Sequence, residues 1–192
     1  MWETEEFGAE HEGRPGVLLA DGTEPKPVLF DVGSGATMHQ STDWWVYDGT
    51  LGAPVAAELR GACSCGWRGP HRYSVDWESV DRRRPYLTDT TGPESDWTAH
   101  ITDVQDQAVP LPAELLTLLD QAEQHLTALA DERPTAALRA AAALERLTQR
   151  AGNAAAFAID TPEGPAWEAI ARDLGISERT ARSRLTRYVL GR

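Results

Sequence analysis

The segment WEAIARDLGISERTARSRLTRY, residues 167–188, has the spacing of two short helices that cross at a turn. Ala171 supplies the small residue needed where the helices cross, and Gly175, four residues later, suits a left-handed turn. Ser177 is a good N-cap for the second helix. The apolar positions that such a unit must bury are Ile170, Leu174, Ile176, Ala181 and Leu185. The segment therefore predicts a helix over 167–174, a turn and a second helix.

The second helix, expected over 179–190, has two unlike faces. Ala181, Leu185 and Tyr188 share the inner face, whereas the outer face is rich in arginine and hydroxyl groups. A DNA recognition helix needs such a face, because arginine pairs with phosphates and with guanine edges in the major groove. The candidate DNA-contacting residues are Ser177, Arg179, Arg182, Ser183, Arg184, Thr186 and Arg187. The alternative is an ordinary surface helix pair with a solvated arginine face.

The charge of the chain is unevenly distributed. The formal net charge is −12, but residues 166–192 carry six arginines against three carboxylates, a net charge of +3. Residues 1–165 therefore carry −15. A basic end on an acidic body is typical of a segment that binds a polyanion.

Two further helices are expected upstream. The stretch QAVPLP at 107–112 marks a boundary, after which the composition shifts to alanine and leucine. Apolar residues at helical spacing predict a helix over 112–131, and Pro134 opens another that Gly152 and Asn153 are expected to stop. The sequence NAAAFAID would then add a short separate helix. Residues 112–192 are thus expected to form an all-α domain.

The stretch LGISERTARSRL resembles the helix-turn-helix of region 4 in extracytoplasmic-function sigma factors and of related response regulators. More broadly, residues 113–188 resemble small actinobacterial helix-turn-helix proteins, in which two Ala/Leu-rich helices precede a Trp-led unit. The resemblance implies binding to double-stranded DNA. No promoter-melting region 2 is recognisable upstream, so a complete sigma factor is excluded. Because one helix-turn-helix usually reads a half-site, we expect a homodimer, formed through the helix at 112–131.

The stretch RGACSCGWRG, residues 60–69, contains the only two cysteines, Cys63 and Cys65. In a reducing cytosol they are expected to be thiols or metal thiolates. Gly66 lets the backbone turn so that both thiolates face one side, and a zinc site would need two more ligands. Five histidines are available: His11, His39, His71, His100 and His125.

The histidines differ in their surroundings. His100 lies on a predicted helix, His39 just before a predicted strand, and His71 close to the cysteines, whereas His11 lies in an acidic arm. The CSCGW stretch, followed by a Trp and a His, resembles small Cys-x-Cys-Gly-Trp modules of actinobacterial proteins of unknown function. That resemblance favours a structural zinc held by Cys63, Cys65 and His100, with His39 as the fourth ligand and His71 as the alternative.

Other interpretations of the cysteines remain open. In one, the two cysteines are buried free thiols. In the other, they form a redox pair, although a Cys-x-Cys disulfide closes a strained ring. A catalytic zinc would need an open position and a general base. Asp76, Glu78 and Asp81 are nearby, but no HExxH-like spacing positions any of them.

The sequence therefore predicts an α+β protein: an acidic, loosely ordered arm (1–27), a β-rich zinc-binding domain (28–107) and an all-α helix-turn-helix domain (112–192). The expected function is sequence-specific DNA-binding regulation rather than enzymatic activity. The alternatives are an adaptor whose acidic, Trp-rich domain binds a protein partner, and a zinc hydrolase. The acidic N-terminus is unlike a signal peptide and no apolar run is long enough to span a membrane, so we expect a cytoplasmic protein.

Overall fold

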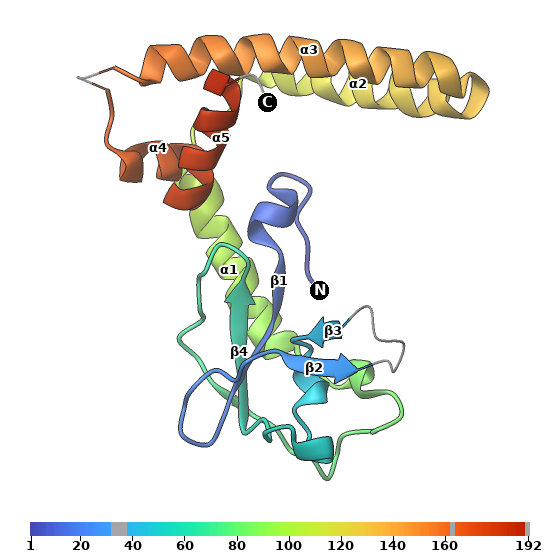
Figure 1. Cartoon of the computed structure of the whole chain (residues 1–192), viewed down its shortest axis with the longest axis vertical. Helices are drawn as coiled ribbons and strands as arrows, with labels where there is room; N and C mark the ends of the chain where they lie inside the picture. The colour runs from blue at the N-terminus through green and yellow to red at the C-terminus, as the bar shows by residue number, and fades with distance from the viewer. Residues whose placement is uncertain (32–37, 162–163, 191–192) are drawn as a thin grey trace. The chain divides into compact units, whose positions relative to one another are not determined.

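The computed structural model of the chain describes residues 1–31, 38–161 and 164–190 (Figure 1). The described residues form a mixed α+β structure, which confirms the fold class at this level. The chain divides into two compact units, Met1–Asp106 and Gln107–Arg192. We call them the N-terminal unit and the C-terminal unit and describe each by itself.

The N-terminal unit contains two small antiparallel sheets in its described part. The first has the strand order β1-β4-β5, and the second is the hairpin of β2 and β3. In the first sheet, Gly13 lies opposite Cys63 and Leu18 opposite Glu58. The strands are β1 (Gly13–Leu18), β2 (Val28–Asp31), β3 (Met38–Ser41), β4 (Glu58–Cys63) and β5 (Tyr73–Ser74). The described part of the unit also contains the 3₁₀ helices η1 (Gly8–His11), η2 (Trp44–Val46), η3 (Thr50–Gly52) and η4 (Pro85–Leu87).

The N-terminal segment, expected as a loosely ordered arm, contributes β1 to the main sheet. Val17 and Leu18 are buried, because the apolar residues of β1 pack into the core once the strand pairs with β4. Trp2 extends this pairing by exchanging two backbone hydrogen bonds with Gly13, at N···O distances of 2.8 and 2.7 Å. Its pairing with β4 does not follow from local pattern, since the paired residues lie about forty to fifty positions apart in the sequence.

The tryptophans of the N-terminal unit lie in two clusters rather than in one core around the cysteines. Trp44 and Tyr47 belong to the first, where the Trp44 and Trp77 ring centroids are 5.6 Å apart. Trp97 belongs to the second, which also contains Cys63 and Ile101. The residues around Trp44 form the 3₁₀ helix η2, in which Trp44 is buried.

Helix α1 (Thr91–Gln107) covers the region of the second cluster. The Asp89 carboxylate accepts hydrogen bonds from the backbone N–H of Thr91 (2.9 Å) and from its hydroxyl (2.6 Å), which satisfies groups at the start of the helix. Pro93, Trp97 and Ile101 recur every four residues and are all buried. His100 therefore lies beside the buried stripe.

The C-terminal unit is helical throughout its regular structure in the described residues. Its helices are α2 (Ala113–Glu132), α3 (Pro134–Ile159), α4 (Trp167–Asp173) and α5 (Glu178–Leu190). The two long helices, α2 and α3, lie side by side in Figure 1 as an antiparallel hairpin closed at Arg133. No helix among the described residues is both long and apolar enough to cross a membrane.

Helix α3 continues past Gly152 and Asn153, where the sequence predicts a stop. The Tyr188 ring of α5 fills the space beside Gly152, where a Cβ atom would lie 2.3 Å from it. The Asn153 side chain donates a hydrogen bond to the Tyr188 carbonyl at 2.9 Å. Both residues are thus used for packing against α5, and the expected short helix is the last part of α3.

Candidate functional site

Four side chains of the N-terminal unit converge in a cluster that could hold a metal ion. They are His11, Cys63, Cys65 and His100, and one ligand atom from each lies within 4.8 Å of all the others. The Cys63 Sγ is 3.5 Å from the His11 Nδ1, and the Cys65 Sγ is 3.5 Å from the His100 Nε2. His11 and Cys63 are buried and the other two are partly buried. We call these four residues the His₂Cys₂ cluster.

Ser64, between the two cysteines, brings His11 to the cluster. Its hydroxyl donates to the Ala9 carbonyl and accepts from the Glu12 backbone N–H, both at 2.9 Å. Its own backbone N–H donates to the Glu12 carbonyl, also at 2.9 Å. Three hydrogen bonds made by Ser64 therefore fix the segment that carries His11 against the turn at residues 63–67, which we call the cysteine turn.

The backbone of the cysteine turn directs both sulfur atoms to one side. Gly66 has a φ of 101°, which only glycine adopts readily, and its N–H donates to the Cys63 carbonyl at 3.0 Å. The Trp67 backbone N–H donates to the Cys65 Sγ at 3.4 Å. An N–H aimed at sulfur favours the thiolate, which is the form that binds metals.

His100 is oriented by its neighbours on α1 and in the cysteine turn. Its ring stacks on the Trp67 indole, with centroids 4.4 Å apart and an interplanar angle of 6°. Trp97 and Ile101 on the same helix are buried next to Cys63. The packing of α1 therefore holds the His100 Nε2 toward the cysteines.

The electrostatics of the cluster favour a cation. The hydrogen bond between the two cysteines lowers the pKa of Cys63 and raises the pKa of Cys65, so that one proton is shared by the pair. Burial of the resulting negative charge is costly unless a positive group compensates it. Two imidazole nitrogens and two sulfurs around one point supply a suitable set of donors for a metal ion.

The structure brings together three of the residues predicted as metal ligands, namely Cys63, Cys65 and His100. The side chain of His39, on β3, lies outside the part of the chain that the structure describes. The alternative fourth ligand, His71, is exposed, and its Nδ1 lies 2.8 Å from the Asp96 Oδ1. The fourth member of the cluster among the described residues is His11, because the pairing of β1 with β4 carries it to the cysteine turn.

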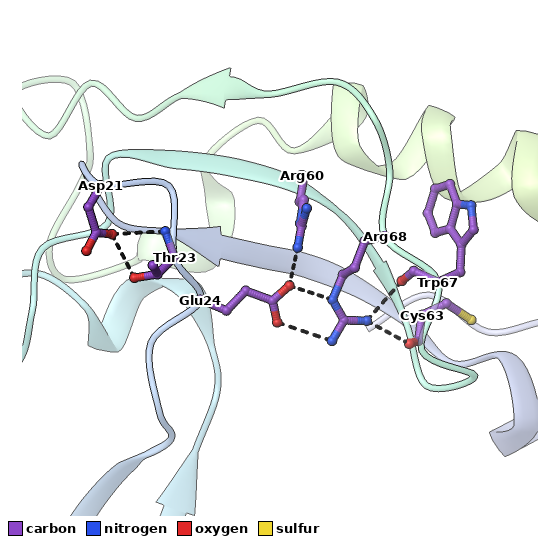
Figure 2. A network of polar contacts seen from close by, with 7 residues as sticks. All are labelled: Asp21, Thr23, Glu24, Arg60, Cys63, Trp67 and Arg68. Atoms are coloured by element: carbon purple, nitrogen blue, oxygen red, sulfur yellow. Dashed lines mark hydrogen bonds and ion pairs between the residues drawn. The ribbon is translucent and has the colours of Figure 1, made fainter. Parts of the chain in front are cut away.

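An ion-pair network contacts the backbone of the cysteine turn (Figure 2). The Arg68 guanidinium donates to both oxygens of Glu24, at 2.8 and 3.3 Å, and Arg60 donates to the same carboxylate. Arg68 also donates to the backbone carbonyls of Trp67 (2.9 Å) and Cys63 (3.3 Å). The guanidinium of Arg68 lowers the pKa of Glu24, which therefore stays ionised at neutral pH.

Replacing Arg68 with alanine is expected to weaken metal binding by about 10- to 100-fold, as removal of groups that orient metal ligands typically does. Arg68 contacts two carbonyls of the cysteine turn, whereas Arg60 reaches only Glu24 among these groups. Arg60→Ala is therefore the matched control. Competition with a chromophoric chelator measures both affinities. Equal affinities for the two variants would show that the network does not position the cysteines.

In the C-terminal unit, α4, α5 and the end of α3 share a small apolar core. Its buried residues are Ala156, Ile170, Ala171, Ile176, Ala181 and Leu185. Gly175 in the turn has a φ of 62°, and the Ser177 hydroxyl accepts the Thr180 backbone N–H at 3.2 Å, as an N-cap does. Leu174, predicted to be buried, is instead 37% exposed at the end of α4. The other four predicted core positions are buried.

The candidate DNA-contacting residues lie mainly on the exposed side of α5. Arg179, Arg182, Ser183, Thr186 and Arg187 are exposed, and Ser177 and Arg184 are partly buried. The Arg182 guanidinium lies 4.4 Å from the centre of the Trp167 ring, and its Nη2 is 3.7 Å from a carboxylate oxygen of Glu178. These contacts hold Arg182 along the surface of α4 and α5.

No protein-family model, curated protein or solved structure matches the chain.

Proposed function

We propose that the protein is a sequence-specific DNA-binding regulator whose C-terminal unit reads DNA with a helix-turn-helix formed by α4 and α5. The observation that carries the proposal is the two-sided character of α5. Its inner residues Ala181 and Leu185 are buried, while its outer side exposes arginine and hydroxyl groups. Such a helix is held rigidly and offers donors to phosphates and guanine edges.

The roles of individual residues follow from their positions on α5. Arg179, Arg182, Ser183 and Thr186 would face the bases, since they follow i, i+3, i+4, i+7 spacing on the exposed side. Arg184, Arg187 and the N-cap residue Ser177 would contact phosphates. The net charge of +3 over residues 166–192 favours binding to a polyanion, whereas the −15 carried by residues 1–165 keeps the rest of the chain away from the phosphates.

Selection from fragmented genomic DNA tests the proposal. The metal-loaded chain is expected to enrich a discrete sequence at low salt. Affinity for that sequence should then fall steeply as salt rises, because phosphate contacts release counterions. The slope of log K against log salt counts the contacts, at about −0.9 for each phosphate. The absence of any enrichment at low salt would contradict DNA reading and favour an adaptor that binds protein through its acidic unit.

For the N-terminal unit we propose that the His₂Cys₂ cluster binds a structural Zn²⁺. In a tetrahedral site with Zn–S and Zn–N bonds of about 2.3 and 2.1 Å, sulfur and nitrogen lie about 3.6 Å apart. The two S···N distances of 3.5 Å fit this geometry. Four protein ligands leave no open position for a substrate, which supports a structural and not a catalytic metal. Free thiols also suit a reducing cytoplasm.

A further inference from the structure

The α2–α3 hairpin exposes many apolar side chains to solvent. Helix α2 has no buried residue along its 20 residues, and the buried residue of α3 is Ala156, near its end. Leu118 is 58% exposed and Leu147 52%. The other exposed leucines of the hairpin are Leu115, Leu116, Leu119, Leu138 and Leu144. An apolar surface of this kind marks an interface.

We propose that a second copy of this chain covers the hairpin, so that α2 and α3 of two copies form a four-helix bundle. A 20-residue helix is about 30 Å long, and two helices side by side are about 20 Å wide. Each copy would thus contribute roughly 600 Å², or about 1,200 Å² for both, which reaches the range of stable protein interfaces. One hairpin therefore offers enough surface for a dimer.

The charges of the two helices identify a copy of the same hairpin as the partner. Helix α2 carries five carboxylates and no Lys or Arg: Glu114, Asp120, Glu123, Asp131 and Glu132. Helix α3 carries Arg139, Arg146 and Arg150 against the single acid Glu145. These side chains are exposed and form no ion pair in the described part of the chain. One helix of the hairpin, α2, is thus acidic, and the other, α3, is basic.

Charge also selects one of the two ways in which the hairpins can stack around a twofold axis. An axis perpendicular to the helices would place α2 on α2 of the partner and join the two acidic helices. An axis parallel to the helices places α2 on α3 of the partner, with antiparallel neighbours throughout. The second arrangement brings acidic and basic helices together, and it is the one we assign.

Light scattering coupled to size-exclusion chromatography of the full chain, without DNA, measures the oligomeric state. The wild type is expected at twice its chain mass of 21.0 kDa. Leu118→Glu combined with Leu147→Glu is expected to give a monomer with unchanged helix content. Leu51→Glu is the matched control, because Leu51 is fully exposed on the N-terminal unit, and it should stay dimeric. A monomeric wild type, or a dimeric double variant, would overturn the proposal.

A charge-reversal pair tests the arrangement itself. One variant carries Glu114→Arg and Glu132→Arg in α2, and the other carries Arg139→Glu and Arg150→Glu in α3. Each alone would place like charges across the interface and is expected to dissociate more readily than the wild type. Mixing the two should give the heterodimer preferentially, because α2 of each then meets α3 of the other with opposite charge. A statistical mixture, or no recovery on mixing, would exclude this arrangement. The result is independent of DNA binding, since no DNA is present.

Discussion

Replacing Cys63 with serine is expected to abolish metal binding and to unfold most of the N-terminal unit, leaving α2–α5 helical. Cys63 ends β4, contacts Trp97 and Ile101, and lies 3.5 Å from the His11 Nδ1. The four residues of the cluster come from η1, the cysteine turn and α1, so a bound metal would join three separate segments of the unit. Structural zinc contributes about 10–16 kcal/mol in zinc-finger peptides. Because the N-terminal unit also has a core around Trp44, we expect its free energy of unfolding to fall by less than this, by several kcal/mol.

Tryptophan fluorescence and near-UV circular dichroism report the unfolding of the N-terminal unit. Trp67 stacks on His100, and the ring centroids of Trp2 and Trp97 are 5.8 Å apart. A strong chelator added to the wild type should produce the same change. His71→Ala is the control, because His71 lies at the surface with Asp96. Elemental analysis that finds no metal in the purified wild type would contradict the prediction. So would a Cys63→Ser protein that melts as the wild type does.

Three of the four metal ligands predicted from the sequence, Cys63, Cys65 and His100, belong to the cluster and lie within residues 63–100, whereas the fourth member of the cluster, His11, does not follow from local pattern. Cys63 and Cys65 share one turn, and the helix that carries His100 has a clear period of four. His11 reaches the site through the pairing of β1 with β4 and the hydrogen bonds of Ser64. Strand pairing over about fifty residues leaves no periodic signal near His11, and the acidic composition of its segment indicates disorder instead.

The helical half was easier to predict because its pattern is local. The predicted start at Pro134 agrees with the structure, and the helix predicted over 112–131 differs by one residue at each end. The expected stop at Gly152 was wrong for a tertiary reason, since the Tyr188 ring needs a residue without a side chain there. Glycine ends helices when the chain must turn, but it also lies within helices where a large side chain approaches closely.

Replacing Arg179 and Arg182 together with alanine is expected to abolish recognition of the selected DNA sequence while the fold is retained. Each bidentate arginine–guanine contact contributes about 1–3 kcal/mol of discrimination. The double variant should therefore bind its site between about 30-fold and about 10⁴-fold more weakly. Arg182 also contacts Trp167 and Glu178, but both contacts are at the surface and stabilise by about 1 kcal/mol or less each. The melting temperature should consequently change little.

The matched control removes the same charge elsewhere. Arg82 and Arg83 lie in an exposed loop of the N-terminal unit, where Arg82 forms a long ion pair with Asp48, at 3.9 Å. Their double alanine variant should keep the affinity and the sequence preference of the wild type. Fluorescence anisotropy on the selected duplex and on a scrambled duplex separates specific from non-specific binding. Because α5 supplies base contacts in this proposal, the Arg179→Ala/Arg182→Ala variant must bind the selected and the scrambled duplex with the same affinity. A variant that kept that difference would place DNA reading on another surface of the protein.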